Sequence, residues 1–388
     1  MRKKKINYMI AGVLLMAVPA FLLMGCAEVK SVLKDGYSAV AETVNPLTPR
    51  KKYAKELAVL PEMAQQWQQS YDTALKDSLQ VALPYAERGY FRTNQSPAYS
   101  YDVVLQQGEM LQAAVATDSL SDKVFIDVLY RSDEGWEHFH ANENAERSVV
   151  LPALVSGTYK IIVQPELSLN SAFVFRMEKK PLYTFPVAGK GNKDIGSFWG
   201  MERDGGKRKH EGIDIFAKRG TPIVAVTDGS VTYTGEKGIG GKQVWLLDRN
   251  FGTHIYYAHL DKISVTDGVQ VKTGDTLGFV GNTGNARTTA PHLHFGVYRG
   301  GAVNPLPFVY QVNAVAQKQL PYLYTTEKLL VKSVANLRLS PSSKSAVVGS
   351  ALKGETVTLL GQSNEWLHVI TGSGKRAFIN RSLISTSI

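Results

Sequence analysis

Three short segments between residues 209 and 298 carry side chains of the types that bind metal ions in proteins. They are His210-Glu-Gly-Ile-Asp214, Tyr257-Ala-His259-Leu and Pro291-His292-Leu-His294-Phe. The whole chain has 8 histidines, and four of them lie in these segments. Imidazole nitrogens and carboxylate oxygens are common zinc ligands, and a catalytic zinc ion usually takes three protein ligands and one water molecule. His210, Asp214 and one histidine of the third segment would supply that number.

The third segment has the alternation of a half-buried β-strand. Apolar residues occupy positions 293, 295 and 297, and His292, His294 and Gly296 alternate with them. Residues two apart on a strand point to the same face, so the two imidazoles project together, about 6–7 Å apart along the backbone. This arrangement suits one histidine that binds a metal and a neighbour that acts on what the metal holds.

The first segment is predicted to be a turn that leads into a strand. His210 and Asp214 have helical spacing, but Gly212 and the β-branched residues at 213 and 215 disfavour a helix. The helical His-Glu-x-x-His motif is also rejected, because position 214 is aspartate. Glu211 is therefore not expected to be the general base.

The second segment belongs to another predicted strand, residues 254–260. Alternation places Ile255, Tyr257 and His259 on one face and His254 on the other. His254 is therefore not expected at the metal.

The same region resembles a known protein family. The stretches HEGIDIFAKRGTPIVAVTDGSVTYTG, YYAHL, GDTLGFVGNTGNA and PHLHFGVY are similar to the catalytic domain of the lysostaphin/LytM-like zinc metallopeptidases, over about residues 196–308. The resemblance implies that His210, Asp214 and His294 bind one Zn²⁺ ion. It also implies that His259 and His292 act in catalysis, as proton acceptor and as hydrogen-bond donor to the developing oxyanion, in an order left open. Every expected position is present, which favours an active enzyme.

The first residues look like a lipoprotein signal peptide, residues 1–25. A basic stretch at residues 2–5 precedes an apolar run at residues 10–23, which is short for a membrane span. Leu23-Met24-Gly25-Cys26 then resembles a bacterial lipobox, which implies a lipid on Cys26, the one cysteine of the chain. This predicts a protein of the cell envelope that is anchored to a membrane and faces the periplasm.

The charge of the chain fits an anionic polymer as partner. The net charge is +10, and removal of the four basic residues near the start leaves about +6. A mild positive balance suits the cell wall. It would also suit nucleic acid, but no basic helix or aromatic-basic motif supports that partner.

The predicted fold is mainly β and has several domains. Residues 26–50 are a tether, and residues 51–180 combine a helical stretch with a β-sandwich. The metallopeptidase domain, residues 181–309, is expected to be an antiparallel β-sheet, and residues 326–388 resemble a small bacterial SH3-like β-barrel. In the helical stretch an apolar stripe is predicted to pack on the core; its members are Met63, Trp67, Tyr71 and Leu75.

Several further side chains are candidates for binding. Arg203 and Arg208 precede His210 and are candidates to meet a substrate carboxylate, although solvated surface charge is an equal alternative. Trp366 is either a binding platform or part of the C-terminal core. His138 and His140 form a second His-x-His pair, which is interpreted as surface or loop histidines.

These features together predict a zinc-dependent endopeptidase that hydrolyses the peptide cross-links of peptidoglycan. The alternative is a non-catalytic adaptor that binds the wall or activates another cell-wall hydrolase, and a third possibility is a peptidase of other secreted proteins. Peptidoglycan stem peptides and, through Cys26, a membrane are the predicted partners. In some members of the resembled family an upstream asparagine blocks the metal, and Asn192 is the candidate for that role here.

Overall fold

The computed structural model describes residues 47–92, 97–143, 146–312 and 326–385. The predicted signal peptide, Cys26 and most of the predicted tether lie outside the described residues. All described elements belong to one compact unit that begins at Leu47. Within the described ranges, no helix has both the length and the hydrophobicity needed to cross a membrane.

The first described elements are short helices, as predicted. They are α2 (Pro49–Glu56), η1 (Leu57–Val59) and α3 (Pro61–Lys76). The Thr48 side chain caps α2, and Pro61 occupies the first turn of α3, where its missing N–H group is not needed. Trp67 and Tyr71 of the predicted stripe are buried, whereas Met63 is 40% exposed. Core packing is therefore confirmed for the two aromatic residues and wrong for Met63, in the first turn.

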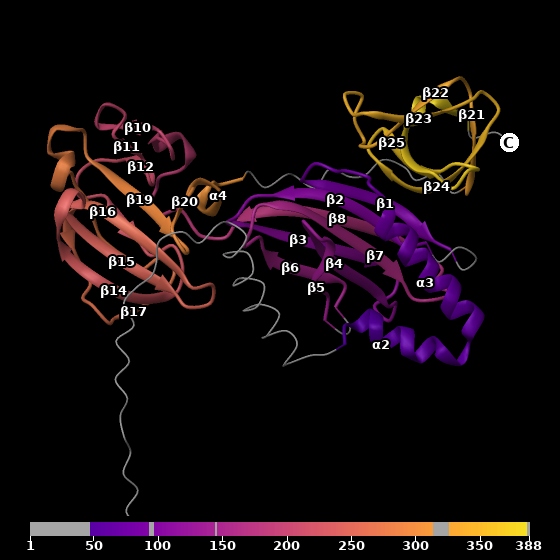
Figure 1. The fold of residues 1–388 in the computed structure, drawn as a ribbon, viewed down its shortest axis with the longest axis horizontal. Coiled ribbons are helices and arrows are strands. Elements are labelled where there is room, and N and C mark those ends of the chain that lie inside the picture. Colours follow the sequence, from indigo (N-terminus) through magenta and orange to yellow (C-terminus); the bar gives the residue numbers. More distant parts are fainter. Residues whose placement is uncertain (1–46, 93–96, 144–145, 313–325, 386–388) are drawn as a thin grey trace, which may run out of the picture. The chain divides into compact units, whose positions relative to one another are not determined.

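Two antiparallel sheets then form the predicted β-sandwich (Figure 1). One sheet has the order β2-β7-β4-β5, and the other includes β1, β8, β3 and β6 side by side. Inward-facing residues of both sheets, among them Tyr101, Ile161 and Phe175, make one buried core. The strands are β1 (Tyr85–Phe91), β2 (Tyr99–Leu105), β3 (Glu109–Thr117), β4 (Val124–Ser132), β5 (Gly135–Ala141), β6 (Ser148–Pro152), β7 (Gly157–Pro165) and β8 (Ser171–Pro181).

The C-terminal domain is a small SH3-like β-domain with its own core. Its strand β24 pairs with β1 of the sandwich through Arg88 with Gln362 and Gly89 with Gly361, so one sheet is continuous across both domains. The strands are β21 (Lys328–Val331), β22 (Ala335–Arg338), β23 (Val347–Ala351), β24 (Thr356–Ser363), β25 (Trp366–Ile370), β26 (Arg376–Asn380) and β27 (Ile384–Ser385).

The central domain, residues 183–309, is built on a ten-stranded antiparallel sheet with the main order β17-β14-β15-β16-β19-β12-β9. Its strands are β9 (Ile195–Ser197), β12 (Ile213–Phe216), β13 (Pro222–Val224), β14 (Gly229–Glu236), β15 (Lys242–Asp248), β16 (Thr253–Ile263), β17 (Gln270–Val271), β18 (Thr276–Val280), β19 (His292–Tyr298) and β20 (Ala302–Val303). A separate hairpin consists of β10 (Glu202–Arg203) and β11 (Arg208–Lys209). Two short 3-10 turns, η4 (Gly238–Gly240) and η5 (Gly284–Thr288), contact each other.

The two faces of the central sheet have different roles. Along β19, Leu293, Phe295 and Val297 are fully buried in the core, as their alternation predicts. His294 lies on the other face, where it pairs with Ala258 of β16 on one side and with Asp214 of β12 on the other. The three adjacent strands β12, β19 and β16 therefore form this second face, on which His294 lies.

Candidate metal centre

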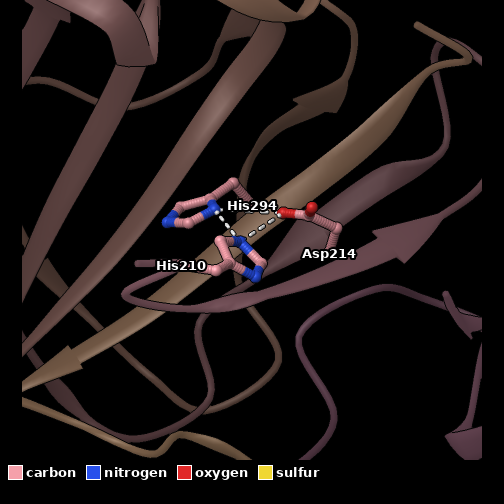
Figure 2. A group of neighbouring side chains, drawn as sticks. All are labelled: His210, Asp214 and His294. Carbon is pink, nitrogen blue, oxygen red and sulfur yellow. Dashed lines mark hydrogen bonds and ion pairs between the residues drawn. The ribbon is translucent and has the colours of Figure 1, made fainter. Parts of the chain in front are cut away.

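His210, Asp214 and His294 form a compact group of ligand atoms (Figure 2). Nε2 of His210 lies 3.0 Å from Oδ1 of Asp214 and 3.0 Å from Nδ1 of His294. The third edge, from Nδ1 of His294 to Oδ1 of Asp214, is also 3.0 Å. Among the described residues this is the one group of three or more such side chains close enough to hold a metal ion.

The triangle fits a zinc ion in size and chemistry. With zinc–ligand bonds of about 2.0–2.1 Å, the ligand atoms of a tetrahedral site lie about 3.3 Å apart, close to the observed edges. Two imidazoles and one carboxylate are zinc ligands, and three protein ligands leave the fourth position for water or substrate. A metal-binding role for these side chains is therefore physically consistent.

The ionisation of the ligands also suits a metal. Burial alone would raise the pKa of Asp214, but hydrogen bonds and charge from His210 and His294 lower it below the usual range. Burial lowers the pKa of His294. An anionic carboxylate and a neutral imidazole are the forms that bind metal ions.

A backbone carbonyl orients His210. Nδ1 of His210 lies 2.8 Å from the carbonyl oxygen of Phe198. A carbonyl can only accept a hydrogen bond, so Nδ1 carries the proton and Nε2 keeps its lone pair toward the other ligands. The Ser197 hydroxyl lies 3.5 Å from the same nitrogen.

Gly212 allows the chain to pass against a ligand. A Cβ atom at this position would lie 2.5 Å from Cε1 of His294 and 2.7 Å from the carbonyl oxygen of Phe295. Any side chain here would push apart the two strands that hold Asp214 and His294. The predicted turn leading into a strand is present, with β12 beginning at Ile213.

His292 and His259 present the same ring nitrogen to the site. Nδ1 of His292 donates to the Ala290 carbonyl at 2.8 Å, and Nδ1 of His259 donates to the Thr283 carbonyl at 2.9 Å. Each ring therefore has Nε2 available as a proton acceptor. The ring centres are 5.1 Å apart. Burial, followed by the neighbouring imidazoles, lowers the pKa of His259 to about 4, which keeps it neutral at neutral pH.

The face predicted for the second segment needs a correction. Ile255 and Tyr257 are buried in the core, so strict alternation would also direct His259 away from the metal. His259 instead has a φ of +65°. The pairing of β16 with β15 shifts between Tyr257 and Leu260, around His259, and its pairing with β18 shifts just after it, as at a β-bulge. The bulge turns His259 toward His292. His254 lies on the face of the site but is exposed, opposite Tyr298 and away from the ligands.

All five residues line one pocket of about 380 Å³. Gly240 of η4 and Ala286 of η5 line it as well, and so do the aromatic side chains of Phe216, Tyr256 and Tyr298. The Phe216 ring lies 5.1 Å from the His292 ring. The three candidate ligands and the two additional histidines, His259 and His292, therefore line the same pocket.

The other predicted residues are distributed as follows. Arg203 contacts Asp214 itself, with Nη2 2.8 Å from Oδ2, and Arg208 lines the pocket. Trp366 is partly buried against the sandwich core, and its role in binding stays a prediction. His138 pairs with Asp127 at 3.5 Å on the sandwich.

Asn192 is not placed as a metal plug. The Asn192 side-chain amide donates a hydrogen bond to the backbone carbonyl of Gln311, and its carbonyl oxygen accepts one from the Gln311 backbone N–H. Both polar groups of the side chain therefore bind the end of the central domain. The pocket lining does not include it.

Sequence reasoning missed the groups that orient the histidines. The carbonyls of Phe198, Thr283 and Ala290 are backbone atoms, and every residue type has one. No side-chain signal could have identified them.

Comparison with known proteins identifies two domains. Residues 208–305 match the model of Peptidase family M23, and residues 333–385 match the model of the bacterial SH3 domain. The chain therefore carries an M23 peptidase domain followed by a bacterial SH3 domain.

Parts of the chain are also similar to individual proteins. The DD-carboxypeptidase/endopeptidase Mpg of Neisseria meningitidis serogroup B is 44% identical over 100 residues, which are 26% of this chain and 22% of Mpg. The L-Ala–D-Glu endopeptidase of Bacillus subtilis is 35% identical over 125 residues, covering 30% of this chain and 38% of the relative. The solved catalytic domain of lysostaphin from Staphylococcus simulans is 34% identical, covering 29% of this chain and 89% of that domain, with a TM-score of 0.27. The chain therefore spans well under half the length of Mpg and of the Bacillus subtilis relative.

Proposed function

We propose that this protein is a zinc-dependent endopeptidase that hydrolyses peptide cross-links of peptidoglycan. The observation that carries the proposal is the triangle of His210, Asp214 and His294, with 3.0 Å edges, beside two histidines whose Nε2 atoms are available. The M23 domain match supports the reaction class.

The chemistry divides between the metal and the protein. His210, Asp214 and His294 would hold a zinc ion, which would supply Lewis acidity for a peptide carbonyl and a water molecule. His259 and His292 would accept a proton at Nε2 or, once protonated, donate a hydrogen bond to the developing oxyanion. Both Nδ1 atoms are engaged by backbone carbonyls, so neither ring can present the wrong nitrogen.

The substrate class is supported by the relatives. Mpg is named a DD-carboxypeptidase/endopeptidase and the Bacillus subtilis relative an L-Ala–D-Glu endopeptidase, so the two names specify different peptide bonds. What such relatives share is action on the peptides of peptidoglycan. We assign this chain to that class without choosing the bond.

The test combines zinc content with release of peptides from purified peptidoglycan. His294→Ala should lose both zinc and cleavage. His259→Ala should keep zinc and lose at least about 100-fold in turnover, because it removes a proton-transfer group but no ligand. Cleavage retained in both variants would refute the assignment. Wild-type protein that binds peptidoglycan but contains no zinc and cleaves nothing would support the adaptor alternative.

We also propose that the protein is anchored by a lipid on Cys26 at the periplasmic face of the envelope. The support is the sequence alone: a basic start, an apolar run and Leu23-Met24-Gly25-Cys26 in the order of a lipoprotein signal. Labelling of the growing cell with a fatty-acid analogue should mark the wild-type chain but not Cys26→Ser. A labelled Cys26→Ser variant, or an unlabelled wild type, would contradict the anchor.

A further inference from the structure

The two oxygens of the Asp214 carboxylate have different partners. Oδ1 lies 3.0 Å from the ligand nitrogens of His210 and His294. Oδ2 accepts a hydrogen bond from Nη2 of Arg203 at 2.8 Å. The Asp214 side chain is 11% exposed and that of Arg203 is 28% exposed, so the pair is only partly open to water.

Arg203 also contacts Ser197, which lies beside the second candidate ligand, His210. Ser197 of β9 is the cross-strand partner of Asp214, and Arg203 of β10 donates to the Ser197 hydroxyl. That hydroxyl is 3.5 Å from Nδ1 of His210, next to the Phe198 carbonyl that orients the ring. One guanidinium therefore contacts Asp214 directly and reaches His210 through Ser197.

We propose that Arg203 is a positioning residue that holds Oδ2 of Asp214, so that the carboxylate offers only Oδ1 to the metal. A carboxylate can bind an ion through one oxygen or through both, and a second oxygen would occupy the position that water or substrate needs. Arginine is suited to this task because its planar N–H groups bind carboxylate and hydroxyl together. The inference rests on the proposed zinc site and replaces the prediction that Arg203 meets a substrate carboxylate.

Two effects of Arg203 on metal affinity have opposite signs. Its positive charge repels a divalent cation, so removing it by charge alone would strengthen metal binding. Its hydrogen bond orients a ligand, and loss of such an outer contact usually weakens metal binding by about 10–100-fold. Partial exposure screens the charge, so the orienting effect should dominate. A fall in zinc affinity on removal of Arg203 would therefore indicate a positioning role, and a rise would indicate an effect of charge alone.

The experiment compares the full chain with three variants. Zinc affinity is measured by competition with a chelator, and the coordination number is followed by the visible absorption of bound Co²⁺, which weakens when a four-coordinate ion gains a ligand. Arg203→Met should lower zinc affinity at least about 10-fold and weaken the Co²⁺ band. Arg203→Lys, which keeps the charge but not the planar fork, should fall between wild type and Arg203→Met.

Lys209→Met is the matched control. Lys209 is exposed on the same hairpin, so the variant removes one positive charge near the site without touching Asp214. It should match wild type in both measurements. Circular dichroism shows whether Arg203→Met folds. If it does not, Arg203→Lys becomes the deciding variant, and an unchanged zinc affinity and Co²⁺ spectrum in Arg203→Lys would overturn the proposal.

The remaining outcomes are also decisive. A rise in zinc affinity in Arg203→Met, or an unchanged affinity and spectrum, would overturn the positioning role while leaving the zinc site itself intact. Wild-type protein that binds neither Zn²⁺ nor Co²⁺ would remove the proposed function, and the inference with it. The two failures are thus distinguished by the wild-type measurement alone.

Discussion

His259 lines the candidate site and has an unfavourable backbone conformation. A φ of +65° is rare for a residue with a side chain and costs of order 1 kcal/mol or more. The irregular pairing of β16 around it enforces this conformation, and the imidazole thereby reaches the face of the candidate metal site. The strained backbone conformation therefore sets the direction of the His259 side chain.

This strain gives a stability prediction. At position 259, Gly should be more stable than Ala by about 1 kcal/mol, since glycine adopts positive φ without penalty. Thermal unfolding in the presence of a chelator measures both variants, and neither should retain turnover. Ala258→Gly is the control, and it should destabilise, because Ala258 is buried and has an ordinary φ. A more stable His259→Ala than His259→Gly would contradict the strained geometry.

The same histidine predicts a pH dependence of the metal-free protein. The pKa of His259 is lowered to about 4, and that of His294 is lowered too, mainly by burial. The His259 imidazole therefore binds a proton below about pH 6.5 in the unfolded chain, but only near pH 4 in the folded protein. The free energy of unfolding should fall as the pH drops through that window, by up to about 1.4 kcal/mol per pH unit from His259, and the lowered pKa of His294 acts in the same direction.

The check is the unfolding midpoint of chelator-treated protein between pH 7 and pH 5. His259→Gln lacks the titrating group, so its midpoint should change less steeply with pH than that of wild type. Equal slopes would show that His259 does not carry the lowered pKa.

At the scale of elements, the site depends on how closely β12 and β19 approach. The strands pair Asp214 with His294, and the chain before β12 passes directly over the His294 ring at Gly212. Spacing along the sequence therefore selects the ligands, whereas the absence of a side chain at Gly212 allows them to meet.

Gly212→Ala should weaken metal binding. The added Cβ would lie 2.5 Å from the His294 ring and 2.7 Å from a backbone oxygen, so a ligand strand must move. We expect zinc affinity to fall at least about 10-fold, in line with other losses of ligand orientation. Competition with a chelator measures the change. Gly372→Ala, with open space around its Cβ, should leave affinity unchanged; the same affinity in both variants would argue against tight packing at Gly212.

At the scale of the whole molecule, a buried carboxylate joins the sandwich to the SH3 domain. Glu87 of β1 is fully buried and accepts hydrogen bonds from the hydroxyls of Tyr85 and Tyr101. Nδ1 of His368, on β25 of the SH3 domain, lies 3.1 Å from the other Glu87 oxygen. Together with the pairing of β1 and β24, this contact ties the SH3 domain to the sandwich.

His368→Ala should destabilise the protein by about 3 kcal/mol, because it removes a partner of a buried carboxylate and leaves a cavity. Urea unfolding measures the loss. Glu365→Ala breaks an ion pair with Arg381 in the same domain, but the Glu365 and Arg381 side chains are 57% and 41% exposed, so the cost should stay below about 1 kcal/mol. If both variants lose the same stability, the junction is not held by Glu87.

The mainly β fold, the candidate ligand side chains and the strands that carry them could be predicted from the sequence. These follow from side-chain chemistry and from alternation, which are local properties. Alternation correctly placed His292 and His294 on one face and Leu293 in the core. The same rule failed at His259, because a bulge depends on pairing with strands far along the chain.

The contacts that orient the candidate ligands are visible only in the folded chain. Arg203 and Asp214 are eleven residues apart and meet only because β9, β10 and β12 fold together. The carbonyls that set each histidine tautomer come from loops and carry no sequence signature. A list of residue types specifies which atoms can bind a metal, whereas the direction in which those atoms point is set by long-range backbone contacts that no short pattern encodes.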